Sequence, residues 1–181
     1  MATLMVGGTG MLSDAAIGLA QRREIVHLVS RHRDRFEDLR RRAGPWGAFL
    51  RWHPADYRDA ASFRAALEAA WSAAPYHRVV LWGSDPAAWA ELTTTVSHLA
   101  GAQAWALYFV RGSQHWNGPP PSVPPTCTLR IVILGFVLQG PTQARWLTHQ
   151  EISQGVLDAV IEQAPYRVVG TVHPWDRRPA W

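Results

Sequence analysis

Three glycines close to the start of the chain, Gly7, Gly8 and Gly10, could hold the phosphate groups of a nucleotide. Glycine permits positive φ and lets backbone amides approach an anion closely. The apolar residues before the glycines predict a buried strand at 3–8, and helical spacing predicts a helix at 11–23. The amides and partial positive charge at the start of that helix suit a pyrophosphate group. A tight strand-to-helix turn without a ligand is the alternative interpretation.

Basic residues follow the next predicted strand, at 24–30. In dinucleotide-binding folds an acidic residue near this position binds the ribose hydroxyls. The position here is held by a serine and three arginines, Ser30, Arg31, Arg33 and Arg35. Guanidinium groups bind a phosphate that a carboxylate would repel, so the sequence predicts NADP(H) in preference to NAD(H), with Arg31 as its main contact. The alternative is that these arginines form a solvated helix face.

The elements that must position these residues alternate in type along the chain. Seven segments are predicted to be strands, at 3–8, 24–30, 47–53, 77–83, 104–110, 128–138 and 166–172. Five are predicted to be helices, at 11–23, 33–44, 59–74, 86–100 and 148–164, the last opening with a capping box from Thr148 to Glu151. This alternation predicts one α/β domain over 1–181, a Rossmann-like, doubly wound and mostly parallel sheet of about seven strands.

One segment interrupts the alternation. A helix is expected between the fifth and sixth strands, but residues 111–128 form an irregular stretch in which five of the seven residues 119–125 are proline. No helix tolerates that density of proline, because each ring removes an amide donor and clashes with the preceding turn. Polyproline II or irregular loop is therefore expected here.

Composition limits the compartment and the partners. With 48% hydrophobic and 18% charged residues, the chain resembles a compact globular protein. The single cysteine, Cys127, allows no internal disulfide and favours a reducing compartment such as the cytoplasm. No signal-peptide pattern is present at the start, and the longest apolar run, 131–138, is too short to span a bilayer. No membrane partner is expected.

The positive charge is concentrated in one place. Residues 22–42 contain eight of the 18 basic residues, all of them arginine, against four acidic residues, and the rest of the chain is balanced at ten and ten. A single basic patch suits one anionic group better than it suits nucleic acid. Eight histidines are scattered without i, i+4 pairing or a cysteine partner, so no metal site is predicted.

The order of the elements and several short motifs resemble the short-chain dehydrogenase/reductase superfamily. The motifs are VGGTGML at the first turn, SR after the second strand and ADY after the third. More narrowly, RIVILGFVLQG with RWLTHQEISQGVLDAV is similar to a group of small bacterial proteins labelled short-chain dehydrogenases. The resemblance extends over residues 3–175.

The resemblance implies a cofactor site. The residues that match the phosphate-binding turn are Gly7, Gly8, Thr9, Gly10, Met11 and Leu12. Those that match the adenosine ribose and the adenine contact are Ser30, Arg31, Asp56 and Tyr57. Trp82 and Gly83 stand after the fourth strand, where the superfamily has an Asn-Ala-Gly stretch that is absent from this chain.

The resemblance also bears on catalysis. The superfamily reduces carbonyl groups with a tyrosine as general acid, a lysine that lowers its pKa and a serine that orients the carbonyl. Ser113, after the fifth strand, matches the serine, whereas the chain has no lysine and the helix due to carry the tyrosine and lysine is replaced by prolines. His115, expected beside the nicotinamide, is the candidate proton donor.

Two functions remain open on this basis. The first is an atypical NADP(H)-dependent oxidoreductase acting on a small carbonyl or alcohol. The second is a non-catalytic dinucleotide-binding module that senses redox state or binds a partner. The tail 172–181 holds two tryptophans with little to bury them, which is compatible with the interface of a homo-oligomer or with a cap over the cleft.

Overall fold

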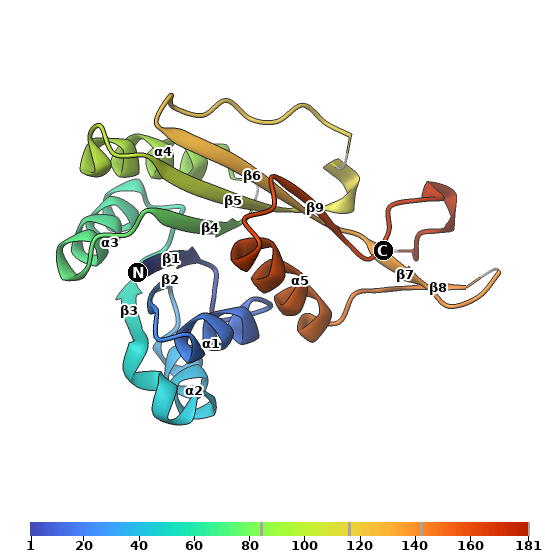
Figure 1. Ribbon diagram of the computed structural model, residues 1–181, viewed down its shortest axis with the longest axis horizontal. Coiled ribbons are helices and arrows are strands. Elements are labelled where there is room, and N and C mark those ends of the chain that lie inside the picture. The colour runs from blue at the N-terminus through green and yellow to red at the C-terminus, as the bar shows by residue number, and fades with distance from the viewer. Residues whose placement is uncertain (84, 116, 142, 181) are drawn as a thin grey trace.

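The computed structural model has a central sheet with helices on both of its faces (Figure 1). It describes residues 1–83, 85–115, 117–141 and 143–180, with the backbone alone at His115. The strands of the main sheet are β1 (Ala2–Val6), β2 (Ile25–Ser30), β3 (Leu50–Pro54), β4 (Arg78–Trp82), β5 (Trp105–Gly112), β6 (Cys127–Leu134) and β9 (Tyr166–Val169). Their order in the sheet is β3-β2-β1-β4-β5-β6-β9, and every neighbouring pair is parallel. The predicted seven-stranded, doubly wound sheet is confirmed.

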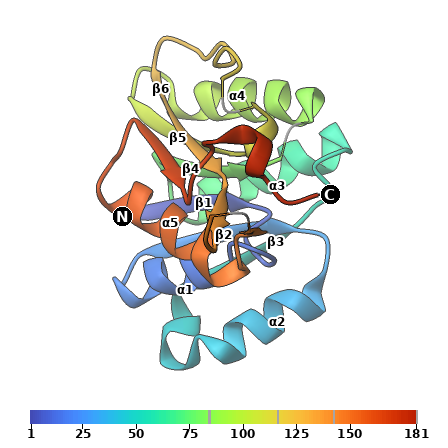
Figure 2. The ribbon, with the colours of Figure 1, turned by 90° about the vertical axis from the view of Figure 1, so that its right-hand side faces the viewer.

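Five helices form the two outer layers. They are α1 (Ser13–Gln21), α2 (Arg33–Arg42), α3 (Ala60–Ala73), α4 (Pro86–Ala100) and α5 (His149–Ile161). α1, α2 and α5 cover one face of the sheet, and α3 and α4 cover the other (Figure 2). Strand β1 shows why both layers are needed: Met5 packs with the first group and Leu4 with the second, and all five of its residues are buried. No described helix combines the length and apolar character needed to cross a bilayer.

The strand predicted at 47–53 begins later than expected. Residues Gly44–Phe49 form a 3-10 helix, and β3 starts only at Leu50. Pro45 has the fixed φ of a helix start, and the rings of Trp46 and Phe49 lie 6.3 Å apart against the core beside α2. Packing of these two rings, rather than strand propensity, decides the local structure.

The strand predicted at 128–138 is divided at Gly135. β6 ends at Leu134, and β7 (Phe136–Leu138) leaves the main sheet to pair in antiparallel fashion with β8 (Ala144–Trp146). A Cβ on Gly135 would lie 2.1 Å from the carbonyl oxygen of Thr171, so the chain crosses itself at this point. The apolar sequence predicts one continuous strand because it contains no sign of this long-range crossing.

The β7–β8 hairpin projects from one end of the molecule and is tied to α5 and to the C-terminal tail (Figure 1). Arg145 donates two hydrogen bonds of 2.8 Å to the Glu151 carboxylate, and Thr148 completes the predicted capping box. These donors lower the pKa of Glu151 to about 2. The Trp146 indole donates to the Ala180 carbonyl at 3.2 Å, so the described part of the tail lies against the hairpin.

In its described residues, the connection between β5 and β6 has no α-helix and only the short 3-10 helix Ser113–His115. Residues 117–126 are turn, bend or irregular backbone. β5 and β6 nevertheless pair in parallel from Trp105 to Gly112. Val123 packs against the apolar cluster that β5 shares with α3 and α4. The proline segment therefore takes over part of the covering role that a crossover helix has elsewhere in this sheet.

Candidate cofactor site

A cavity of about 300 Å³ opens at the carboxyl ends of β1, β2 and β4. It is lined by Gly7, Thr9, Gly10, Met11, Val29, Ser30, Arg31, His32, Arg35, Ala55, Tyr57 and Trp82. Because β1 lies between β2 and β4, loops that are far apart in the sequence meet at this point. The strand order reverses here, and ligands of open parallel sheets bind at such a switch point.

The turn after β1 forms the floor of the cavity. Gly7 has φ of +81°, and its amide donates to the Val29 carbonyl at 3.3 Å, which fixes the turn against β2. A Cβ on Gly8 would lie 2.6 Å from a Leu28 methyl group, so this glycine allows close packing below the cavity. Around Gly10 nothing lies within 4 Å of an added Cβ, which leaves the backbone there open to a ligand.

Two residues matched to the phosphate-binding turn lie in the core instead of at the cavity wall. Leu12 is completely buried in the cluster between the sheet and α1, and Gly8 is also buried. Leu12 precedes α1 and provides no side-chain cap, and the Ser13 amide donates to the Gly10 carbonyl at 3.0 Å, so only the later amides of the first turn are left for a ligand. Asp14 in that first turn is paired with Arg42, so its negative charge is partly neutralised. The start of α1 therefore keeps amide donors for an anion.

Ser30 is held in place at the end of β2. The indole N–H of Trp52, on the neighbouring strand β3, donates to the Ser30 hydroxyl oxygen at 3.1 Å and to its carbonyl oxygen at 3.2 Å. The hydroxyl keeps its own proton, and Ser30 lines the cavity, so it is a positioned donor for a hydroxyl or phosphate oxygen of a ligand.

The arginines after β2 have different surroundings. Arg31 lines the cavity and makes an ion pair with Asp56 at 3.7 Å, with both side chains well exposed. Arg35 also lines the cavity, and it makes no ion pair with the described residues. Arg33 does not reach the cavity, because it is paired with Glu37 at 3.8 Å and lies 6.0 Å above the Trp52 ring.

The sequence names Arg33 and Arg35 together, without separating them, and does not select His32. Helical spacing contains the missing signal. His32 and Arg35 are three residues apart around the start of α2, so both face the cavity, whereas Arg33 is rotated away from it. A count of basic residues alone cannot separate these positions.

The loop after β3 contributes unequally to the cavity. Tyr57 is half-buried and lines it. Asp56 does not line it, since its carboxylate accepts the Arg58 amide at 3.0 Å and pairs with the Arg31 and Arg58 guanidinium groups at 3.7 and 4.0 Å. Asp56 therefore lies beside Arg31 outside the cavity wall, and Tyr57 is the residue of this loop that can contact a ligand.

Trp82 and Gly83, at the end of β4, line two different cavities. The Trp82 side chain lines the first cavity, and its Cβ lies 3.6 Å from the place of an added Gly7 Cβ. Gly83 lines a second cavity, between α4 and β5. Trp82 thus stands as a bulky aromatic wall beside the glycine turn, at the place where the superfamily has small residues.

The candidate catalytic residues lie at the end of β5. Ser113 begins a 3-10 helix (Ser113–His115), is only 1% exposed, and its hydroxyl has no hydrogen-bond partner among the described residues. It lines neither of the two cavities. The side chain of His115 lies outside the described residues, so its candidacy stays a prediction.

Histidines elsewhere form a pair and not a metal centre. His27 Nδ1 lies 3.0 Å from His53 Nε2, and His27 Nε2 lies 2.9 Å from the Ala74 carbonyl oxygen. Burial, followed by the neighbouring His53, lowers the pKa of His27 to about 4, and burial lowers that of His53 as well. The part of the chain that the structure describes holds no cluster of three or more histidine, cysteine or acidic side chains suited to a metal.

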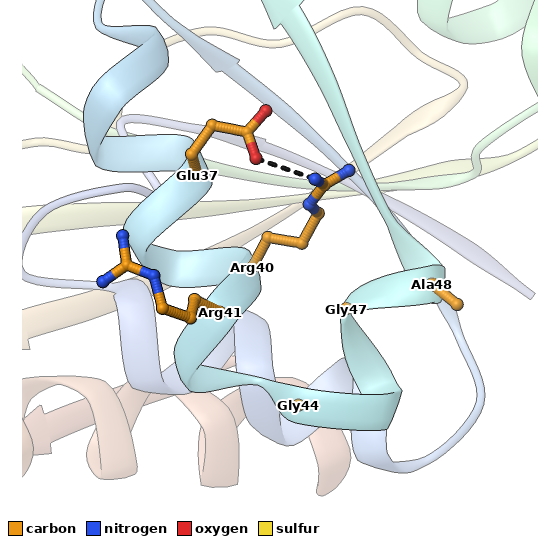
Figure 3. A pocket seen from close by; sticks show the side chains of 6 residues that line it. All are labelled: Glu37, Arg40, Arg41, Gly44, Gly47 and Ala48. Carbon is orange, nitrogen blue, oxygen red and sulfur yellow. Dashed lines mark ion pairs between the residues drawn. The ribbon is translucent and has the colours of Figure 1, made fainter.

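A larger hollow of about 570 Å³ is lined by α2 and by the 3-10 helix Gly44–Phe49 that follows it. Figure 3 shows its arginines, Arg40 and Arg41, with Glu37 beside them. Arg40 pairs with Glu37 at 2.9 Å, and Arg41 pairs with Asp38 at 3.2 Å. Because their charges are already matched by neighbouring acids on the same helix, we assign this hollow no ligand.

The fold and its cavity define an open, doubly wound α/β protein with a hollow at the switch point of the sheet. Solved structures of this fold include a variant of actinorhodin polyketide ketoreductase with NADPH, at TM-score 0.72 and 11% identity over 94% of this chain and 96% of that one. A short-chain type dehydrogenase/reductase from Mycobacterium marinum matches at TM-score 0.72 and 10% identity, over 96% and 94%. A 3-ketoacyl-ACP reductase from Sinorhizobium meliloti 1021 matches at 0.67 and 14%, over 93% and 96%.

These similarities establish the fold. The chain has the architecture of short-chain dehydrogenases and reductases, as the resemblance implies. At the level of sequence, no model of a protein family matches the chain, and none of the curated proteins searched does.

Proposed function

We propose that the chain binds a nicotinamide dinucleotide in the cavity at the ends of β1, β2 and β4, prefers NADP(H) to NAD(H), and acts as an oxidoreductase on a small carbonyl or alcohol. The observation that carries the proposal is the pair Arg31 and Arg35 at the rim of this cavity, beside Ser30 and without an acid that lines it. A carboxylate at this rim would favour ribose hydroxyls, and two guanidinium groups favour a 2′-phosphate.

The other residues of the cavity fit the same ligand. The open backbone at Gly10 and the uncapped amides at the start of α1 suit a pyrophosphate. The aromatic faces of Tyr57 and Trp82 suit a ring system on either side of it. When bound, the dinucleotide supplies or accepts the hydride, while this chain's residues bind it, orient it and neutralise its phosphates.

The ion pair between Arg31 and Asp56 does not block this role. At 3.7 Å, with side chains 47% and 38% exposed, the pair is a weak surface interaction. A phosphate monoester carries more charge than a carboxylate and has three acceptor oxygens, so it competes well for the guanidinium. Arg58 remains beside Asp56 at 4.0 Å when Arg31 turns to a ligand.

Calorimetric titration with NADPH and with NADH tests the cofactor assignment. We expect NADPH to bind more tightly, and each of Arg31→Gln and Arg35→Gln to weaken NADPH binding about tenfold with little change for NADH. Arg41→Gln is the matched control, since Arg41 is exposed on the same helix and outside the cavity. Failure of both nucleotides to bind would contradict the proposal.

The burial of Ser113 favours the second candidate function, a dinucleotide-binding module without catalysis. A hydroxyl that orients a substrate carbonyl must touch the substrate, and this one is 1% exposed and lines neither cavity. The chain also has no lysine to lower the pKa of a tyrosine. Binding without turnover is the property that separates this function from an oxidoreductase.

A panel of aldehydes and ketones, followed by NADPH oxidation, decides between the two. Turnover that falls at least tenfold in Ser113→Ala or His115→Ala supports the oxidoreductase and the candidate residue concerned. Ser97→Ala is the control, because Ser97 also carries a buried hydroxyl without a described partner but belongs to α4. Tight NADPH binding with no turnover on any substrate supports the binding module, and turnover unchanged in both variants removes Ser113 and His115 as catalytic residues.

A further inference from the structure

A second cavity, of about 320 Å³, lies between the start of α4 and the end of β5. Its walls come from three separate parts of the chain: the loop after β4 with the first turns of α4, the end of β5, and the proline segment, through Pro121. It adjoins the first cavity along the chain, because Trp82 lines one and Gly83 the other.

The body of this cavity is apolar and aromatic. The rings of Trp89 and Phe109 have centroids 4.8 Å apart and are tilted by 58°. The rings of Pro86 and Pro121 complete the lining from α4 and from the proline segment. Such a surface suits a flat apolar group, because aromatic and proline rings pack against it without polar atoms to desolvate.

One cation stands at the edge of this apolar surface. The Arg111 guanidinium lies 5.4 Å from the centre of the Phe109 ring, and Arg111 forms no ion pair with the described residues. The acid of the lining, Asp85, accepts the Ala87 and Ala88 amides through Oδ1 at 2.9 Å each, as the cap of α4, and makes no ion pair with Arg111 among the described residues. The positive charge of Arg111 is therefore left for another partner.

We infer that this cavity binds a small molecule with an aromatic or similarly flat apolar body and a carboxylate group, and that this molecule is the substrate class of the protein. The ring lies against Trp89 and Phe109, and the carboxylate accepts hydrogen bonds from Arg111. Gly83 of this cavity directly follows Trp82 of the first cavity at the end of β4, which would bring the bound molecule beside the proposed cofactor. The term substrate rests on the proposed function; the binding itself does not.

Isothermal titration with 4-phenylbutyrate, and with 4-phenylbutan-1-ol as the neutral analogue, tests the binding. We expect the carboxylate to bind at least about tenfold more tightly than the alcohol, and Arg111→Gln to remove that difference. Trp89→Leu should weaken the binding of both ligands, because it removes an aromatic ring from the cavity wall. Arg178→Gln is the matched control, because Arg178 also lies over an aromatic ring, that of Trp175, but does not line the cavity.

Thermal unfolding of each variant confirms that it is folded before it is titrated. Equal binding of the acid and the alcohol, or equal binding of the acid to the wild type and Arg111→Gln, overturns the inference. NADPH is titrated into the same samples, which keeps the two proposals apart. If 4-phenylbutyrate binds in an Arg111-dependent way and NADPH does not bind, the carboxylate site is supported and the proposed cofactor function fails. If NADPH binds and 4-phenylbutyrate does not, the cofactor function is supported and the carboxylate site fails.

Discussion

In the sheet, β1, β2 and β3 lie on one side of β4, and β5, β6 and β9 lie on the other. The connections between strands differ between these two sides, and so does the character of the cavity on each. On the β1–β3 side every crossover contains a helix, and short loops bring arginines, glycines and Ser30 around a polar cavity. On the β5, β6 and β9 side one crossover is a proline segment, and the strand after Gly135 leaves the sheet for a hairpin. The cavity on that side is aromatic, with Arg111 as its cation.

The two cavities differ in what determines their structure: local turns for one, and long-range contacts for the other. The polar cavity depends on turns whose geometry follows from a few neighbouring residues, such as Gly7 with its φ of +81°. The aromatic cavity and the hairpin depend on segments that are distant in the sequence: Pro121 and Trp89 line the same cavity, and Gly135 lies against Thr171. Substitutions that act on each kind of contact can therefore test the comparison.

The largest effect is expected where the chain crosses itself. Gly135→Ala would place a Cβ 2.1 Å from a backbone carbonyl oxygen, which has no freedom to move aside, so the free energy of unfolding should fall by about 3 kcal/mol or more. Urea unfolding measures this change. Gly10→Ala, in the β1–β3 half of the molecule, adds its Cβ to open space and should change the free energy of unfolding by no more than about 0.5 kcal/mol. Equal losses of stability in Gly135→Ala and Gly10→Ala would contradict the distinction between long-range and local control.

The next effect depends on pH and belongs to the β1–β3 side. His27 takes up a proton near pH 6.5 in the unfolded chain but only near pH 4 in the folded one, so protonation favours unfolding as pH falls from 6.5 to 4. The lowered pKa of His53 acts in the same direction. Protonation of His27 alone should lower the free energy of unfolding by roughly 2 to 3 kcal/mol when the pH falls from 7 to 4.5.

Urea unfolding of the wild type and of His27→Gln at these two pH values measures that contribution. The variant should lose less stability than the wild type on acidification. His98→Gln, which alters an exposed histidine on α4, should lose as much as the wild type. A His27→Gln variant with undiminished acid sensitivity would rule out the buried histidine pair as the cause.

The smallest effect concerns the start of α5 beside the hairpin. Thr148→Ala removes the hydroxyl that accepts the Glu151 amide at 3.2 Å, and it should lower the free energy of unfolding by about 1 kcal/mol. Thr94→Ala, at an exposed position within α4, should leave stability unchanged or slightly raised, because alanine is the better helix former. Thermal unfolding at neutral pH compares them, and a smaller loss at Thr148 than at Thr94 would contradict the capping role.

The sequence predicts the seven strands and five helices well because hydrophobic periodicity and capping signals are local. It predicts which loops surround the first cavity because parallel strands place their carboxyl ends together. It does not separate Arg33 from Arg35, since that depends on where α2 begins, and it does not reveal the burial of Ser113. The crossing at Gly135 and the position of Pro121 in the wall of the aromatic cavity depend on segments far apart in the sequence, and no local pattern encodes them.

The proline segment between β5 and β6 also has a consequence for the unfolded chain. Each proline ring fixes φ before folding begins, so residues 119–125 have few conformations to lose when β5 and β6 pair. A glycine- or serine-rich connection of the same length would lose far more backbone entropy on closing the same crossover. The segment that forms no helix thus lowers the entropic cost of joining two parallel strands, and it presents Pro121 to the aromatic cavity on a backbone that is stiff from the start.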